Sequence, residues 1–204
     1  NGRPAPHRIR QCGVIQYLLR PAGDEHFSDL GAFIGDTIRE LLHYTDGKFA
    51  SVTALEPDRR SFRKLNEWAS ANITGDVTLV QAGAWNEDTV KCFTDQAGRQ
   101  SRVAGQGKET QMRALDSVLS GRPCTYLKMD VEGAEREAIA GAEKTIRQYA
   151  PKLNIAAHHR SEDFFQLPLL IHALQPSYRL YLRTILPSAV GFDFVCVEKK
   201  IEST

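Results

Sequence analysis

"FSDLGAFIGDT", residues 27–37, is the stretch of sequence that decides the fold prediction. A short strand pattern ends at Asp29 to Gly31, a second glycine follows at Gly35, and a helical pattern begins at once. Glycine lets the backbone turn sharply and approach a neighbouring group closely. A strand, a glycine turn and a helix in this order predict the first unit of an α/β fold with a ligand near the turn.

Strand patterns alternate with helix-length segments along the rest of the chain. Strands are expected at 49–56, 77–83, 89–95, 124–131 and 152–159, helices at 57–72 and 133–150, and a terminal hairpin at 178–184 and 191–199. This order predicts an α/β fold with a mostly parallel sheet, helices on both faces and a C-terminal antiparallel hairpin. We expect a lead-in segment at 1–25 that packs against a single domain at 26–204.

The composition excludes several classes of protein. With 204 residues, 42% hydrophobic and 25% charged, the chain is expected to be soluble and globular. A net charge of +1 gives no global field to attract nucleic acid or a membrane, and no run reaches the roughly 18 to 20 apolar residues of a bilayer span. Four cysteines without a C-x-x-C pair indicate reduced thiols and a cytoplasmic protein. The start at Asn1 without an apolar signal segment suggests a trimmed or processed chain.

Polar residues and glycines follow the predicted strands. They are Asp29 to Thr37, Glu56 with Pro57, Gly83 to Trp85, Asp130 to Gly133, and His158 with His159. Ligands of open α/β sheets bind beyond the carboxyl ends of the strands, where the strand order reverses. We therefore predict that these segments form one site.

The first turn does not suit a phosphate group. A dinucleotide fingerprint would need glycine where Phe33 stands, Asp36 places a carboxylate at the helix start, and no G-K-[ST] sequence is present. A cofactor with a cationic end fits better, and S-adenosylmethionine carries a sulfonium, an ammonium and no phosphate. Asp29 is predicted to accept that ammonium group. A purely structural turn is the alternative reading of Gly31 and Gly35.

Glu56 ends the second strand, where a carboxylate can accept both hydrogen bonds of a ribose diol. NAD enzymes use the same device, so this residue indicates a nucleoside without naming it. Trp85 is expected to flank an adenine whose edge meets Gly83 and Ala84. The alternatives are a helix-capping acid for Glu56 and a core position for Trp85.

Together the segments FSDLGAFIGDT, ALEPD, QAGAWNE, LKMDVEGAE and AAHH resemble the FkbM family of S-adenosylmethionine-dependent methyltransferases, from about residue 27 to residue 197. The resemblance implies the class I Rossmann-like methyltransferase fold with a seven-stranded sheet, and O-methylation of hydroxyls on sugars, macrolides or other secondary metabolites. It implies that the methionine end of the cofactor lies at the first turn, the ribose at Glu56, the adenine near Ala84 and Trp85, and the reaction centre at Asp130 and Glu132. The residues predicted to line the cofactor are Asp29, Gly31, Ala32, Phe33, Gly35, Asp36, Thr37, Glu56, Pro57, Gly83, Ala84, Trp85 and Asp130.

Methyl transfer to a hydroxyl requires a base or an ion beside the oxygen. His158 is the first candidate for the base, with Asp130 orienting it and Glu132 nearby, whereas His159 is expected to point to the opposite face because side chains alternate along a strand. A divalent cation held by Asp130, Glu132 and His158 is possible but not favoured, since no ligand spacing requires one. The alternatives are a structural histidine pair and a pair of helix-start acids.

Two other functions remain open, namely a nicotinamide-dependent oxidoreductase and a catalytically inactive nucleoside-binding module. Arg59, Arg60, Arg63 and Lys64 are interpreted as a solvated helix face and not as a nucleic-acid patch. The expected partner is a small-molecule acceptor, with no nucleic acid and no membrane. The segments 96–110 and 161–175 are predicted to shape the acceptor pocket, while the acceptor and the oligomeric state stay unidentified.

Overall fold

The computed structural model describes residues 18–93, 108–185 and 191–198. In chain order the elements are β1 (His26–Leu30), α2 (Asp36–Tyr44), β2 (Ser51–Leu55), α3 (Arg59–Asn72), β3 (Val77–Val80), β4 (Gly83–Ala84), β5 (Thr89–Phe93), β6 (Lys108–Arg113), α4 (Leu115–Leu119), β7 (Tyr126–Met129), α5 (Glu135–Ala140), α6 (Glu143–Tyr149), β8 (Lys152–Ala156), α7 (Asp163–Leu174), β9 (Tyr178–Ile185) and β10 (Gly191–Glu198). Most of the predicted lead-in segment and most of the loop at 96–110 lie outside the described residues.

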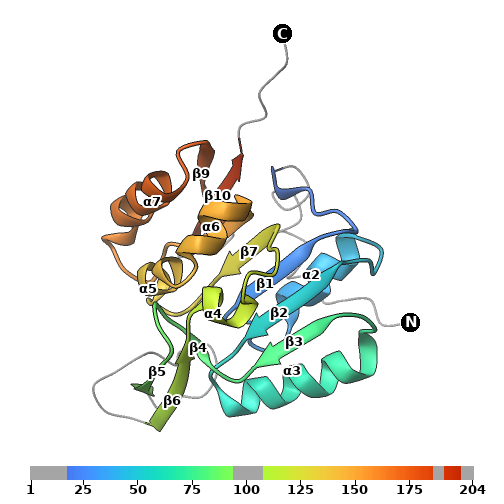
Figure 1. Ribbon diagram of the computed structural model, residues 1–204. Coiled ribbons are helices and arrows are strands. Elements are labelled where there is room, and N and C mark those ends of the chain that lie inside the picture. Colours follow the sequence, from blue (N-terminus) through green and yellow to red (C-terminus); the bar gives the residue numbers. More distant parts are fainter. Residues whose placement is uncertain (1–17, 94–107, 186–190, 199–204) are drawn as a thin grey trace.

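Seven strands form the main sheet in the order β3-β2-β1-β7-β8-β10-β9. The strands β3, β2, β1, β7 and β8 run parallel, whereas β10 is antiparallel to both β8 and β9. The strand order reverses between β1 and β7, so the crevice beyond these two strands is the expected ligand position. This arrangement confirms the predicted parallel sheet with its closing hairpin (Figure 1).

Helices cover both faces of the sheet and enclose two apolar cores. Ile38 and Leu41 of α2 and Leu65 of α3 pack with Phe27 and Val52 on one side of the sheet. On the other side α4, α5, α6 and α7 pack against β7 and β8, and Figure 1 shows α4 to α6 in front of the sheet and α2 behind it. Each fully buried leucine or isoleucine contributes about 1.5–3 kcal/mol, so these two cores hold the strand ends in place. No helix within the described ranges is long and apolar enough to cross a bilayer.

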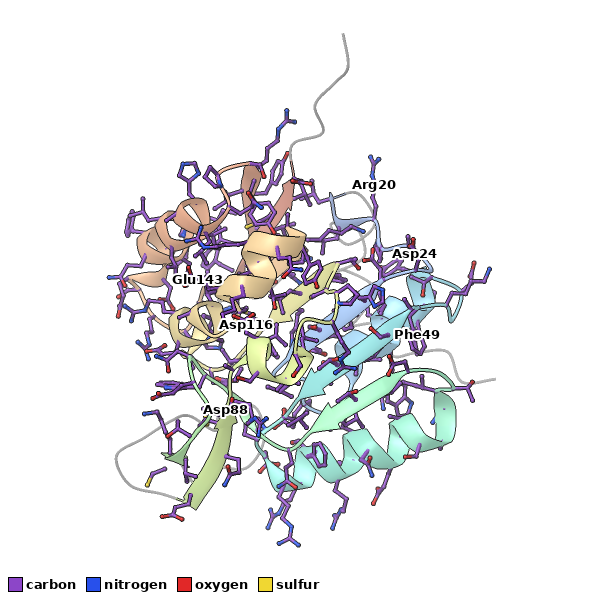
Figure 2. All side chains as sticks on the ribbon, in the orientation of Figure 1. Arg20, Asp24, Phe49, Asp88, Asp116 and Glu143 are labelled. Atoms are coloured by element: carbon purple, nitrogen blue, oxygen red, sulfur yellow. The ribbon has the colours of Figure 1, made fainter. Side chains whose placement is uncertain are left out.

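The single helix predicted at 133–150 is wrong, because the segment forms the two helices α5 and α6. The helical conformation is interrupted near Gly141, where an added Cβ would lie 1.9 Å from the carbonyl oxygen of Trp85. Asp116 of α4 then fixes the start of α6, because its Oδ2 accepts from the amide of Lys144 and its Oδ1 from the amide of Thr145, both at 2.9 Å. Figure 2 labels Asp116 together with Glu143, the first residue of α6.

A second, three-stranded sheet with the order β4-β6-β5 lies beyond the ends of the parallel strands (Figure 1). The sequence predicted only β5 as a separate strand, and it assigned the start of β6 to a loop. Asp88, just before β5, bonds the end of β6: its Oδ1 accepts from the amide of Ala114 at 2.9 Å, and its Oδ2 lies 3.2 Å from Arg113 Nε. Gly83 and Ala84, two of the predicted site residues, form β4, so the small sheet borders the edge where those residues gather.

Candidate active site

Gly31 brings the end of β1 against the end of β7. Its φ is +82°, and a Cβ at this position would lie 2.0 Å from the carbonyl oxygen of Asp130. The amides of Gly31 and Ala32 both donate to the carbonyl oxygen of Leu55 at 3.0 Å, which ties the turn to β2 as well. Glycine is thus required here because the backbone of Asp130 approaches closely, whereas the sequence analysis attributed the glycine to a nearby ligand.

Glu56 joins the first turn to the end of β2. Its Oε2 accepts from the amide of Phe33 at 2.7 Å and its Oε1 from the amide of Asp58 at 2.8 Å. The residue is 6% exposed, and burial raises the pKa of its carboxyl group to about 7 even though these two hydrogen bonds oppose the shift. Because each carboxylate oxygen has two lone pairs, the side chain keeps acceptor capacity for a ribose diol.

The start of α2 is set by its contact with α3. Gly35 has a φ of +83°, and a Cβ there would lie 2.9 Å from Leu65 and 3.0 Å from the Trp68 ring. Asp36 and Thr37, which follow at the helix start, both line a small cavity of about 90 Å³ at the carboxyl edge of the sheet. Three of the predicted turn residues, Gly31, Asp36 and Thr37, therefore line this cavity beside β7.

Asp29, predicted to accept an ammonium group of the cofactor, is fully buried and pairs with a residue that the sequence analysis did not identify. Lys128 Nζ lies 3.0 Å from Asp29 Oδ1 and donates to the carbonyl oxygen of Gly31 at 2.8 Å. Burial lowers the pKa of Lys128, but the carboxylates of Asp29 and Asp130 outweigh it and raise the pKa, so this lysine stays charged. Lys128 thus holds the glycine turn, and the ligand role of Asp29 stays a prediction.

The segment predicted to meet adenine contains β4, the first strand of the small sheet. Gly83 and Ala84 are buried in β4, and Pro57 is half-buried after β2. Trp85 is half-buried, its amide donates to the carbonyl oxygen of Arg113 at 2.9 Å, and Lys91 Nζ lies 4.9 Å from the centre of its ring. The role of this segment toward a nucleobase stays a prediction.

Two acids and two histidines gather where β7 and β8 end. One potential ligand atom from each of Asp130, His158 and His159 lies within 4.8 Å of the others. His159 Nε2 lies 3.5 Å from Asp130 Oδ1 and 3.4 Å from Glu132 Oε2, and the two imidazole rings are 4.3 Å apart. The structure therefore brings the predicted catalytic residues His158 and Asp130 together, and Glu132 joins them through its contact with His159.

The prediction that His159 points to the opposite face is wrong. Strand β8 ends at Ala156, so the two histidines lie in the following loop, where strand alternation does not apply. His159 Nδ1 contacts Glu135 Oε1 at 2.8 Å. Burial lowers the pKa of His159, but the hydrogen bond and charge of Glu135, together with Asp130 and Glu132, raise it overall.

Four polar residues of the cavity, Glu40, Lys128, Asn154 and Asp193, were not predicted as site residues from the sequence. The cavity beside β7 is lined by Gly31, Asp36, Thr37, Glu40, Lys128, Met129, Asp130, Asn154, Ala156 and Asp193. Burial raises the pKa of Asp193 to about 6, and the negative charge of Asp130 adds to the shift. Asp193 interrupts the apolar pattern of β10 and Lys128 that of β7, and such an interruption is the signal that could have marked these two positions.

Comparisons with solved structures agree with this architecture. The crystal structure of Methyltransferase FkbM from Methylobacillus flagellatus KT is similar, with a TM-score of 0.76 and 29% sequence identity. The alignment covers 88% of this chain and 45% of that chain, so this chain spans less than half the length of that neighbour. No curated protein matches this chain.

More distant neighbours share the fold alone. An rRNA methylase from Streptococcus thermophilus has a TM-score of 0.58 at 14% identity, covering 98% of this chain and 99% of that chain. Fibrillarin from Aeropyrum pernix, solved in complex with natively bound S-adenosyl-L-methionine, has a TM-score of 0.57 at 11% identity, covering 93% of this chain and 74% of that chain. These likenesses confirm the predicted class I methyltransferase fold.

The family described as Methyltransferase FkbM domain matches residues 29–194, which include the first turn, Glu56 and the acid–histidine cluster. The match covers most of the 204 residues and confirms the predicted family. This chain belongs to the Methyltransferase FkbM domain family.

Proposed function

We propose that this chain is an S-adenosylmethionine-dependent methyltransferase that methylates a hydroxyl group of a small-molecule acceptor, such as a sugar or a secondary metabolite. One observation carries the proposal: the amide of Phe33 donates to Glu56 at 2.7 Å, so the glycine turn and the ribose-accepting carboxylate lie side by side at the carboxyl edge. Asp36 at the start of α2 disfavours a diphosphate at the same place. A sulfonium nucleoside satisfies both constraints.

The reaction would be an in-line displacement at the methyl carbon. The acceptor oxygen forms a bond to that carbon, the carbon–sulfur bond breaks, and its electron pair stays on sulfur, which becomes a neutral thioether. The hydroxyl proton leaves to a base as the new bond forms, and alignment of oxygen, carbon and sulfur supplies much of the rate. His158 with Asp130 remains the first candidate for this step, and both lie at the end of β7 and β8.

Because Gly31, Asp36 and Thr37 line the cavity beside β7, it would hold the methionine end of the cofactor, and the acceptor hydroxyl would have to reach the methyl group there. Five of the residues that line the cavity, Asp36, Glu40, Lys128, Asp130 and Asp193, carry ionisable side chains. Such a polar lining suits the hydroxyl groups of a sugar-like molecule, because an apolar acceptor would not replace the hydrogen bonds with water that the lining loses when the acceptor binds. The net charge of +1 supports a small-molecule acceptor over nucleic acid, and we retain the expectation of a cytoplasmic location.

Titration calorimetry with S-adenosylmethionine, S-adenosylhomocysteine and NAD tests the cofactor. Labelled S-adenosylmethionine is then incubated with a panel of sugar, macrolide and peptide acceptors, and the label in each product is counted. We expect tight binding of both sulfur nucleosides and label in a hydroxylated acceptor. Tight binding of NAD alone would instead support the oxidoreductase, and cofactor binding without transfer to any acceptor would support the inactive binding module.

A further inference from the structure

We propose that Asp130, Glu132, His158 and His159 form a binding site for a divalent transition-metal ion at the end of β7 and β8. His159 Nε2 lies 3.5 Å from Asp130 Oδ1 and 3.4 Å from Glu132 Oε2. Two ligands on a tetrahedral ion with bonds of about 2.1 Å lie about 3.4 Å apart. His159 Nε2 thus has the spacing of a neighbouring ligand to each of the two carboxylate oxygens, and Asp130, His158 and His159 each offer a ligand atom within 4.8 Å of one another.

The other nitrogen of each imidazole contacts an acceptor. His159 Nδ1 lies 2.8 Å from Glu135 Oε1, and His158 Nδ1 lies 3.1 Å from the carbonyl oxygen of Phe192. Because a carbonyl or carboxylate oxygen accepts hydrogen bonds, both contacts place a proton on Nδ1 and leave Nε2 as the ligand atom. Histidines that bind metal almost always donate their other N–H to such a group.

Glu135 is itself held in position. It is fully buried, and its Oε1 also accepts from the amide of Val131 at 3.1 Å. A buried carboxylate that bonds both the turn after β7 and His159 fixes the ring before any ion arrives. This second observation is independent of the distances among the ligands, and it is the arrangement that orients imidazole toward a metal.

The charge and the access of the cluster also suit a cation. The three carboxylates of Asp130, Glu132 and Glu135 surround the single ring of His159, so the cluster has an excess of negative charge. The His159 side chain is 7% exposed but that of Asp130 is 42% exposed, which leaves one side open to solvent or substrate. Catalytic metal sites keep an open position of this kind.

The donor set indicates the class of ion. Two imidazole nitrogens and two carboxylate oxygens suit Zn²⁺, Mn²⁺, Fe²⁺ or Co²⁺, whereas Mg²⁺ and Ca²⁺ prefer oxygen ligands alone. The catalytic role of the ion rests on the proposed function, but its binding does not. In methyl transfer the bound ion would replace His158 as the group that activates the acceptor, because His158 Nε2 would be a ligand: the ion would bind the acceptor oxygen and lower the pKa of the hydroxyl group, so that its proton is lost to water as the bond to carbon forms.

The test uses untagged protein stripped of metal with a chelator and titrated with Co²⁺ alone, without any nucleoside. Visible absorption reports the coordination of Co²⁺, and calorimetry gives its affinity and stoichiometry. The variants Asp130→Asn and Glu132→Gln remove one ligand each and keep the shape of the side chain. His172→Ala, which changes an exposed histidine of α7, is the matched control.

We expect one Co²⁺ per chain in the unaltered protein and in His172→Ala, and binding at least about tenfold weaker in Asp130→Asn and in Glu132→Gln. Thermal unfolding provides a second measurement, because Co²⁺ raises Tm only in proteins whose folded form binds it. Equal affinity in all four proteins, or no saturable binding by the unaltered protein, would overturn the site. Binding of S-adenosylhomocysteine to metal-free protein is measured separately, so failure of the cation site and failure of the proposed function are distinguished.

Discussion

Phe33 and Glu56 meet at the carboxyl edge of the sheet, where the amide of Phe33 donates a hydrogen bond of 2.7 Å to Glu56 Oε2. The same carboxyl group accepts from the amide of Asp58 at 2.8 Å and is almost fully buried. One side chain therefore shapes the glycine turn and presents the acceptor that the proposed function assigns to a ribose. Changes at Glu56 should consequently affect both folding and cofactor binding.

The first prediction concerns cofactor affinity. Glu56→Gln removes the charge that, in the proposed function, accepts hydrogen bonds from the ribose hydroxyls, and hydrogen bonds to a charged group contribute about 1.5–3 kcal/mol. We expect S-adenosylhomocysteine to bind about 10- to 100-fold more weakly, as measured by titration calorimetry at pH 8. Glu67→Gln, which changes an exposed acid on α3, is the control and should bind normally. Equal affinity of Glu56→Gln and the unaltered protein would contradict the ribose assignment.

The second prediction concerns the pH dependence of stability. Burial raises the pKa of Glu56 from 4.5 to about 7, so the folded protein holds this proton after the unfolded chain has released it. The free energy of unfolding should therefore fall as pH rises from about 4.5 to about 7, by a total of about 3 kcal/mol from this group. Urea unfolding from pH 4.5 to 8 measures the slope.

The slope in Glu56→Gln should be shallower over that interval, because glutamine does not titrate. Glu67→Gln again serves as the control and should keep the slope of the unaltered protein, since its side chain is 67% exposed. Parallel curves for Glu56→Gln and the unaltered protein would show that Glu56 does not titrate in this range.

The gathering of the site residues could be predicted from the sequence, because parallel strands place their carboxyl ends at one edge whatever their exact lengths. Gly31, Glu56 and Asp130 each follow a strong strand pattern, and the structure puts all three at that edge. The orientation of His159 could not be predicted, since it depends on β8 ending at Ala156 and not at the second histidine. Strand ends are set by tertiary contacts that a local pattern does not contain.

The ion pair of Asp29 and Lys128 was also missed. Both residues lie in apolar strand patterns, and they are neighbours only because Asp29 of β1 is the register partner of Lys128 in β7. The register between two strands this far apart in sequence follows from packing of the whole sheet. The sequence indicates that a buried charge needs a partner, but not which residue supplies it.

The third prediction separates two causes for glycine at position 31. In Gly31→Ala the new Cβ would meet the carbonyl oxygen of Asp130 at 2.0 Å, and the backbone would keep a φ of +82°. Gly47→Ala has a similar φ of +76° with nothing within 4 Å, so it measures the backbone effect alone. We expect Gly47→Ala to cost about 1–2 kcal/mol of unfolding free energy and Gly31→Ala to cost about 3 kcal/mol or more. Equal losses in urea unfolding would show that the contact with Asp130 is not limiting.

The fourth prediction concerns the pair formed by Lys128 and Asp29. Lys128→Met leaves the buried carboxylate of Asp29 without its cation and removes the hydrogen bond to Gly31, so we expect a loss of about 3–5 kcal/mol in unfolding free energy. Combining it with Asp29→Asn removes the uncompensated charge, and the double variant should lose less than the sum of the two single variants. The exposed pair Arg63–Glu67 is the matched control, with a coupling of about 1 kcal/mol or less. Additive losses at Asp29 and Lys128 would show that burial does not strengthen this ion pair.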